Sequence, residues 1–181
     1  MLGLPLHEWV ALGMLVALTL YTLLGGADFG GGVWDLLASG PRAPAQRALI
    51  AGVIAPVWEA NHVWLILLVV LLFVGFPRGY APAATALHIP LTLMLVGIVA
   101  RGSAFVFRQY GEPGDTQARW GRVFAIASVV TPVFLGISLG TIVGGEVRVT
   151  RGLVVSGFWS WLGWFPLAVG LLVLCLFSFL A

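Results

Sequence analysis

Long stretches without charged residues constrain this chain more than any other feature of its sequence. Five apolar runs cover most of the 181 residues, at about 9–38, 48–77, 81–107, 120–145 and 153–181. A helix needs about 20 mostly apolar residues to cross the hydrocarbon core of a bilayer. Only 9% of the residues are charged, whereas about a quarter are charged in a typical soluble domain. The sequence therefore predicts an all-α integral membrane protein, a bundle of about five transmembrane helices.

The few charges and the single cysteine exclude several classes of protein. The formal net charge is +2, and no basic tract is present that would follow a phosphate backbone, so nucleic acid is not an expected partner. Cys175 lies in an apolar run, which excludes a disulfide framework. No basic region precedes the first apolar run, so we expect no cleaved signal peptide. The expected surroundings are the lipid bilayer.

The arginines predict the orientation in the membrane, because they accumulate on the cytoplasmic side. The first and third linkers with their flanks carry five arginines: Arg42, Arg47, Arg108, Arg119 and Arg122. The second and fourth linkers carry three: Arg78, Arg148 and Arg151. This distribution favours an external N-terminus.

Two acidic residues lie deep inside predicted membrane spans. The turn between the first two spans centres between residues 43 and 44, and Asp28 and Glu59 are equally distant from it along the chain. At the rise of an α-helix, each lies about 15 Å from the linker end of its span. Both acids are therefore expected near mid-membrane at matching depths, while helix rotation decides whether they face each other. An acid at this depth costs several kcal/mol unless it is paired, hydrated or protonated.

The neighbours of the two acids differ in kind. Small residues surround Asp28, namely Gly25, Gly26, Gly30, Gly31 and Gly32, and allow a neighbouring helix to approach. Polar and aromatic residues surround Glu59, namely Pro56, Trp58, Asn61 and His62. Glu59 and His62 share a helix face and are expected to pair, with Trp58 and Asn61 at their border. Burial disfavours a charged carboxyl, so such groups accept and release protons near neutral pH, and proton carriage is the favoured interpretation.

Other interpretations of these residues stay open at this point. Asn61 is more often a packing group than a functional one. Glu59 and His62 match part of a carboxylate-bridged metal site, but three histidines are too few for a di-metal centre. Haem ligation by His62 or His88 is a further alternative, without a specific motif to support it.

Two features outside the acid pair also have alternatives. Arg101, about two turns before Arg108, either extends to the inner surface or supplies a counter-charge to a group on a partner. A glycine at every fourth position of the fourth span predicts a close helix-packing seam rather than a functional site; these are Gly136, Gly140 and Gly144.

Three motifs together resemble subunit II of the cytochrome bd-type quinol oxidases. They are Gly25-Gly26-Ala27-Asp28-Phe29-Gly30-Gly31-Gly32, Pro56-Val57-Trp58-Glu59-Ala60-Asn61-His62-Val63-Trp64-Leu65-Ile66, and Arg101-Gly102-Ser103-Ala104-Phe105-Val106-Phe107-Arg108. The resemblance implies a haem-free subunit beside a subunit I that carries haems b and d and oxidises quinol while reducing dioxygen. It also implies a prokaryotic plasma membrane and a place in the respiratory chain. A small single-span accessory subunit and a structural quinone are further implied possibilities.

The resemblance also implies roles for individual residues. Glu59 occupies the position of the family's proton-carrying acid, and Asp28 that of its first-span acid. Protons would enter near Asp35 and pass Asp28 to Glu59, with His62 as a further candidate and Trp58, Asn61 and Arg101 in support. Some relatives carry another acid where this chain has Gly25, a gap that water would have to bridge.

Length is the main departure from the family. Its members are about twice as long, with two repeats of four helices. The resemblance thus predicts one antiparallel four-helix unit over residues 1–152, followed by a fifth helix at 153–181 that is cut short.

Two rival functions come from other classes. A small proton-coupled transporter would use the same acids, although the broken, inverted helices typical of such proteins are not seen in the sequence. A purely structural assembly subunit would tolerate neutral substitutions of both acids.

Overall fold

The computed structural model describes residues 3, 5–110 and 114–181, and this part of the chain is almost entirely helical. The elements are α1 (Leu6–Leu37), α2 (Ala43–Gly75), α3 (Pro77–Ala86), α4 (His88–Tyr110), α5 (Asp115–Val143), β1 (Val149–Thr150), β2 (Leu153–Val154), the 3-10 helix η1 (Ser160–Leu162) and α6 (Trp164–Leu180). Helices α1, α2, α4 and α5 are long and apolar enough to span a membrane, and α6 is a shorter apolar helix of 17 residues. The all-α membrane class is confirmed. The exact number of five spans stays a prediction.

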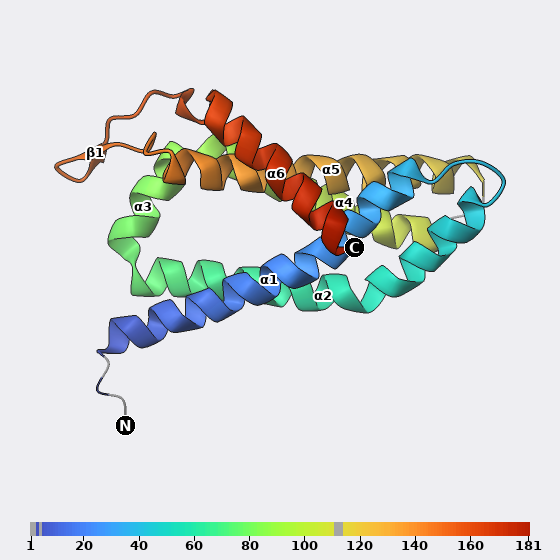
Figure 1. The fold of residues 1–181 in the computed structure, drawn as a ribbon, viewed down its shortest axis with the longest axis horizontal. Helices are drawn as coiled ribbons and strands as arrows, with labels where there is room; N and C mark the ends of the chain where they lie inside the picture. Colours follow the sequence, from blue (N-terminus) through green and yellow to red (C-terminus); the bar gives the residue numbers. More distant parts are fainter. Residues whose placement is uncertain (1–2, 4, 111–113) are drawn as a thin grey trace.

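The long helices run along one common direction, with the connections gathered at the two ends (Figure 1). The start of α1, helix α3 and the β1–β2 hairpin lie at one end. The α1–α2 loop lies at the other end, together with the end of α4 and the start of α5. The first and third linkers therefore share one end of the bundle, as an antiparallel arrangement requires. We call this the loop end.

The predicted third span, 81–107, corresponds to two helices. Helix α3 ends at Ala86, and α4 starts at His88 after a single intervening residue. Pro90 explains the break, because proline has no N–H to bond the carbonyl of residue 86 and its ring clashes with that carbonyl. The part long and apolar enough to cross a membrane is thus α4, and α3 lies at the end of the bundle opposite the loop end.

In the first third of the predicted fifth span, 153–181, the structure also differs from the prediction. Residues 149–154 form a two-stranded antiparallel hairpin in which Thr150 pairs with Leu153. The two turn residues between them, Arg151 and Gly152, both have positive φ, at 54° and 81°. This pairing of positive φ values suits the tight turn of a twisted hairpin. Because the hairpin and η1 occupy residues before Gly163, α6 begins only at Trp164.

The second span begins earlier than the predicted residue 48. Helix α2 starts at Ala43, with Pro44 in its first turn. Proline suits the first turn of a helix, since its missing N–H has no partner there in any case. Pro44 therefore begins a helix rather than belonging to the linker.

Helix α5 is the centre of the bundle, and α2 lies at its edge. In the apolar 18-residue stretch of each helix, 56% of the residues are buried in α5 and 6% in α2. Helix α5 packs against α1, α4 and α6, and α6 also crosses α1 (Figure 1). Helix α2 packs mainly on α1. One side of α2 is consequently free of contacts within the described part of the chain.

The predicted glycine seam of the fourth span is confirmed, and its partner is α6. A Cβ atom at Gly136 would lie 2.6 Å from the Cα of Gly170, and one at Gly140 would lie 2.8 Å from the Cα of Pro166. Backbones therefore meet here without intervening side chains, which is how small residues promote close packing in membranes.

Adding one methyl group to this seam tests the packing. We expect Gly136→Ala to lower the thermal unfolding midpoint, because the added Cβ collides with the backbone of α6. Gly52→Ala in α2 is the matched control, since nothing lies within 4 Å of a Cβ at that position. There, alanine should be neutral or slightly stabilising, given a helix propensity about 1 kcal/mol better than that of glycine. Equal midpoints for the two variants would contradict a tight α5–α6 seam.

Candidate functional site

One face of α1 carries the polar groups of the bundle interior. Its buried residues follow a 4-3-4-3 spacing: Tyr21, Gly25, Asp28, Gly32 and Asp35. Residues at this spacing lie on one side of a helix. The face points to the centre of the bundle, where Gly25 approaches Phe177 of α6 and Gly32 approaches Ser128 of α5. The glycines alternate with the polar residues and let neighbouring helices come close to them.

Asp28 and Arg101 form an ion pair in the middle of this face. Arg101 Nη2 lies 2.6 Å from Asp28 Oδ1, and both side chains are at most 3% exposed. The same Nη2 donates to the main-chain oxygen of Asp28 at 2.7 Å. Asn61 Nδ2 donates to Asp28 Oδ2 at 3.2 Å, and Arg101 Nε donates to Ser128 Oγ at 2.9 Å. The pair thus joins α1 to α2, α4 and α5.

Aromatic rings enclose the guanidinium of Arg101. Its central carbon lies 4.8 Å from the ring centre of Phe29 and 4.7 Å from that of Phe124. Cations at this distance over a ring face are attracted by its quadrupole, more strongly where water is excluded. Phe29 also stacks on Phe177 of α6, with ring centres 6.0 Å apart. The arginine is therefore held both by charge and by its apolar walls.

A second pair repeats the first one nearer the loop end. Arg108 Nη1 donates to Asp35 Oδ1 at 2.9 Å. The two acids are seven residues apart on α1 and the two arginines are seven apart on α4, so both pairs join residues 73 apart in the chain. Since α1 and α4 run in the same direction, the equal spacing aligns the two pairs as successive contacts. Arg47 adds hydrogen bonds to the main-chain oxygens of Asp35 and Ala38.

The two interpretations of Arg101 are now decided. Arg101 is 2% exposed and does not extend to the inner surface. It supplies a counter-charge, but to Asp28 of its own chain rather than to a group on a partner. The seven-residue spacing shared by the aspartates and the arginines was the sequence signal for this arrangement, and sequence reasoning missed it. Ser128, which accepts from Arg101 of another helix, gave no such signal.

Glu59 lies away from this interior cluster. Its side chain is exposed, whereas that of Asn61, two residues later, is buried against Asp28. Two residues correspond to a rotation of about 200° around a helix, so Glu59 points to nearly the opposite side of α2. The structure therefore does not bring Asp28 and Glu59 together, even though the chain spacing predicts equal depths.

The predicted pair of Glu59 and His62 is not formed among the described residues. His62 Nδ1 donates instead to the carbonyl oxygen of Trp58 at 2.7 Å, and its ring packs edge-on against the Trp58 ring. His88 donates from Nδ1 to the carbonyl oxygen of Thr85 at 2.9 Å, where α3 meets α4. Within the described ranges, no three His, Cys, Asp or Glu side chains gather as metal ligands.

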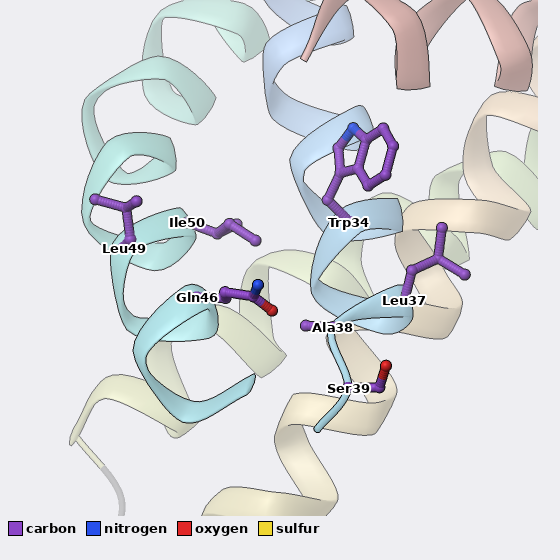
Figure 2. Close-up of a pocket in the computed structure, with 7 residues that line it drawn as sticks. All are labelled: Trp34, Leu37, Ala38, Ser39, Gln46, Leu49 and Ile50. Carbon is purple, nitrogen blue, oxygen red and sulfur yellow. The ribbon is translucent and has the colours of Figure 1, made fainter. Parts of the chain in front are cut away.

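An apolar groove opens between α1 and α2 near the loop end (Figure 2). It has a volume of about 430 Å³ and is lined by Trp34, Leu37, Ala38, Ser39, Gln46, Leu49 and Ile50. A second cavity of about 590 Å³ shares Trp34, Leu49 and Ile50 with it and extends to the end of α6. The lining is apolar except at Ser39, Gln46 and the loop backbone. None of the ion-paired residues lines the groove, which is separate from the buried cluster.

The fold and the site define a multi-pass membrane protein that encloses ion pairs in its interior. Comparison with known families is specific: residues 6–181 match the family described as cytochrome bd terminal oxidase subunit II. The chain belongs to this family.

Individual relatives agree with the family assignment. The chain is 29% identical over 140 residues to cytochrome bd ubiquinol oxidase subunit 2 of Bacillus subtilis, covering 77% of this chain and 41% of the relative. It is 28% identical over 137 residues to cytochrome bd-I ubiquinol oxidase subunit 2 of Escherichia coli, covering 76% and 35%. A probable cytochrome oxidase subunit 2 of Haemophilus influenzae matches 92% of this chain at 25% identity. The chain thus spans less than half the length of these relatives.

Removing one partner of the ion pair between Asp28 and Arg101 tests how much this pair contributes to the stability of the fold. We expect Arg101→Gln to destabilise the fold by about 3–5 kcal/mol, since it leaves a buried charge without its partner. The double variant Asp28→Asn/Arg101→Gln should recover part of this loss, because no charge then remains buried alone. Folded yield and thermal midpoint in detergent measure both effects.

Arg122→Gln is the control for this series, since Arg122 is exposed on α5. It should behave like the unmodified chain. A double variant no more stable than Arg101→Gln alone would show that the two charges are not coupled.

Proposed function

We propose that this chain acts as the haem-free subunit II of a bd-type quinol oxidase in the plasma membrane of a prokaryote. Its partner is the haem-bearing subunit I, which oxidises quinol and reduces dioxygen. The chain itself performs no redox step. It supports the partner structurally and supplies a carboxyl group for the uptake of cytoplasmic protons. Family membership and the exposed position of Glu59 support this proposal.

The observation that carries it is a single acid on an otherwise uncharged, exposed face of α2. The exposed residues of this face have a 4-3-4-3-4-3 spacing: Gly52, Pro56, Glu59, Val63, Ile66, Val70 and Phe73. Such spacing is typical of the contact face between two helices. Val63 and Ile66, on the turns after Glu59, are each 62% exposed. We call this the α2 face.

Lipid is a poor neighbour for the α2 face. A carboxyl group in contact with hydrocarbon costs several kcal/mol, and acids at membrane depth therefore face protein or water. A partner helix on the α2 face removes this cost and places Glu59 at the boundary between the two subunits. A carboxyl there is free of the arginines that hold the other two acids.

The three acids consequently have different roles in this proposal. Asp28 and Asp35 each lie within 3 Å of an arginine, so both carboxylates are engaged in contacts between helices. Glu59 has no ion-pair partner in the described part of the chain, so it is the acid suited to carry protons. The route predicted from Asp35 through Asp28 to Glu59 is thus replaced by one along the subunit boundary. His62 and Trp58 lie on the turn beside Glu59 and remain candidates for that boundary.

The accessory single-span subunit and the structural quinone implied by the family remain predictions. Neither has a contact that places it on this chain.

Co-purification tests the proposed assembly. Affinity purification of the full-length chain from its native membrane should bring down a larger membrane subunit whose absorption spectrum shows b- and d-type haem. The measurement is the reduced-minus-oxidised difference spectrum of the eluate. An eluate that contains the folded chain but no haem protein would contradict the assembly. Proton transport by the purified chain alone in liposomes would then favour the rival transporter function.

A neutral substitution of Glu59 tests the proton role within the assembled oxidase. Positioned acids and bases contribute about 10²–10⁴-fold to proton-transfer steps. We expect Glu59→Gln to slow dioxygen reduction by about tenfold or more while complex yield and haem content stay normal, because the side chain is not buried within this chain. Oxygen consumption with a soluble quinol provides the measurement.

Glu8→Gln is the matched control, since Glu8 is also an exposed glutamate but lies in the first turn of α1. It should leave turnover unchanged. Normal turnover of Glu59→Gln as well would favour the purely structural assembly role over proton conduction.

A further inference from the structure

Three buried polar atoms in the bundle interior lack a hydrogen-bonding partner among the described residues. They are Tyr21 Oη, Asn61 Oδ1 and Asp28 Oδ1. Asp28 Oδ1 has its ion contact with Arg101 Nη2, which also donates to the main-chain oxygen, and a carboxylate oxygen has room to accept a further hydrogen bond. More than nine-tenths of buried polar groups in proteins do have a partner, counting ordered water. Three exceptions in one region therefore require an explanation.

The three atoms belong to one part of the bundle. Asn61 Oδ1 is carried by the same amide that bonds to Asp28, so it lies beside that carboxylate. Tyr21 is on the same face of α1 as Asp28, two turns nearer the start of the helix. Between them on this face is Gly25, which adds no side chain of its own; a Cβ there would lie 3.4 Å from the Phe177 ring and 3.6 Å from Asn61 Nδ2. The polar atoms thus line the interior on both sides of a glycine.

We propose that Tyr21, Asn61 and Asp28 bound an internal hydration site, in which one or more water molecules are held in the middle of the membrane-spanning bundle. Buried waters satisfy polar groups that the protein leaves unpaired, and each makes two to four hydrogen bonds. The three groups suit the bonding capacity of water. The tyrosine hydroxyl donates, whereas the amide oxygen and the carboxylate oxygen accept the two protons that a water molecule offers.

A metal cation is a poorer occupant of this site. Arg101 already places a full positive charge 2.6 Å from Asp28 Oδ1 and so offsets the only negative charge among the three groups. A second cation would be repelled by the guanidinium in a medium of low dielectric constant. An anion would in turn be repelled by the carboxylate. The site therefore suits a small, neutral molecule that both donates and accepts hydrogen bonds.

The hydration site extends the polar interior beyond the ion pairs. From the loop end outward, the sequence of polar groups is Asp35 with Arg108, Asp28 with Arg101 and Asn61, and then Tyr21. Water at the last position adds a hydrogen bond to Asp28 Oδ1 beside the contact from Arg101. This inference concerns the interior of the chain and does not rest on the oxidase function or on Glu59.

Removal of the tyrosine hydroxyl is the first test. Tyr21→Phe preserves the ring and deletes only the group that would bind water. In the full-length chain with its co-purifying partner, reconstituted in nanodiscs, we expect a thermal midpoint several degrees below that of the control Tyr80→Phe. Tyr80 lies half-buried in α3, outside the bundle interior. An unchanged or raised midpoint for Tyr21→Phe overturns the proposal, because deleting a dry, unpaired hydroxyl relieves its desolvation cost.

A double-variant cycle is the second test, and it separates a shared water from two independent effects. Asn61→Leu should remove most of the further loss caused by Tyr21→Phe, since the water would already have lost one of its partners. Additive midpoint shifts overturn the proposal. If Asn61→Leu does not fold, a high-resolution map of the unmodified protein decides instead. Density within hydrogen-bonding distance of Tyr21 Oη and Asn61 Oδ1 supports the site, and its absence overturns it.

The identity of the occupant is tested by exchanging ions. Midpoints in LiCl, NaCl and KCl at equal ionic strength should coincide for a site that holds water. A midpoint that depends on the cation, and whose dependence disappears in Tyr21→Phe, would overturn the assignment to water. All of these readouts are independent of oxidase turnover, so their failure is distinguishable from failure of the proposed function.

Discussion

The buried ion pair of Asp28 and Arg101 is the interaction on which the arrangement of the bundle depends. Two opposite charges in the membrane interior are tolerated only if each keeps its partner and its hydrogen bonds. Those bonds come from four helices, through Asn61 of α2 and Ser128 of α5 as well as the pair itself. A rotation of α1 by one residue would turn Asp28 away from all of them. The pair therefore fixes which face of each helix points inward.

This fixed rotation separates the acids of the membrane-spanning part into two groups. Asp28 and Asp35 are turned inward and paired with arginines, while Glu59 is turned outward on α2. Asp28 and Asp35 hold helices together, since each is ion-paired with an arginine of α4. Within the described residues Glu59 has no ion-pair partner, and its side chain is exposed on α2.

Packing on the opposite side of the bundle is of a different kind. Between α5 and α6, Gly136, Gly140 and Gly170 allow direct backbone contact, with no polar group involved. In lipid there is little hydrophobic gain from bringing apolar helices together, so close van der Waals contact supplies the attraction. The contact between α5 and α6 is consequently stabilised by close packing, and the contact between α1 and α4 by ion pairs.

The sequence by itself determined the membrane class, the antiparallel order of the long helices and the glycine seam. These follow from apolar length, turn residues and residue spacing, which are local properties. Only the tertiary structure decided that Arg101 pairs with Asp28, that Glu59 faces outward, and that α3 and the hairpin interrupt two predicted spans. Spacing along a helix gives the position of a residue along the helix axis. The direction in which its side chain points depends on which neighbouring helix supplies its contacts. Arg101 and Asp28 are 73 residues apart, and the seven-residue spacing that α1 and α4 share points to their contact only once these helices are known to lie side by side.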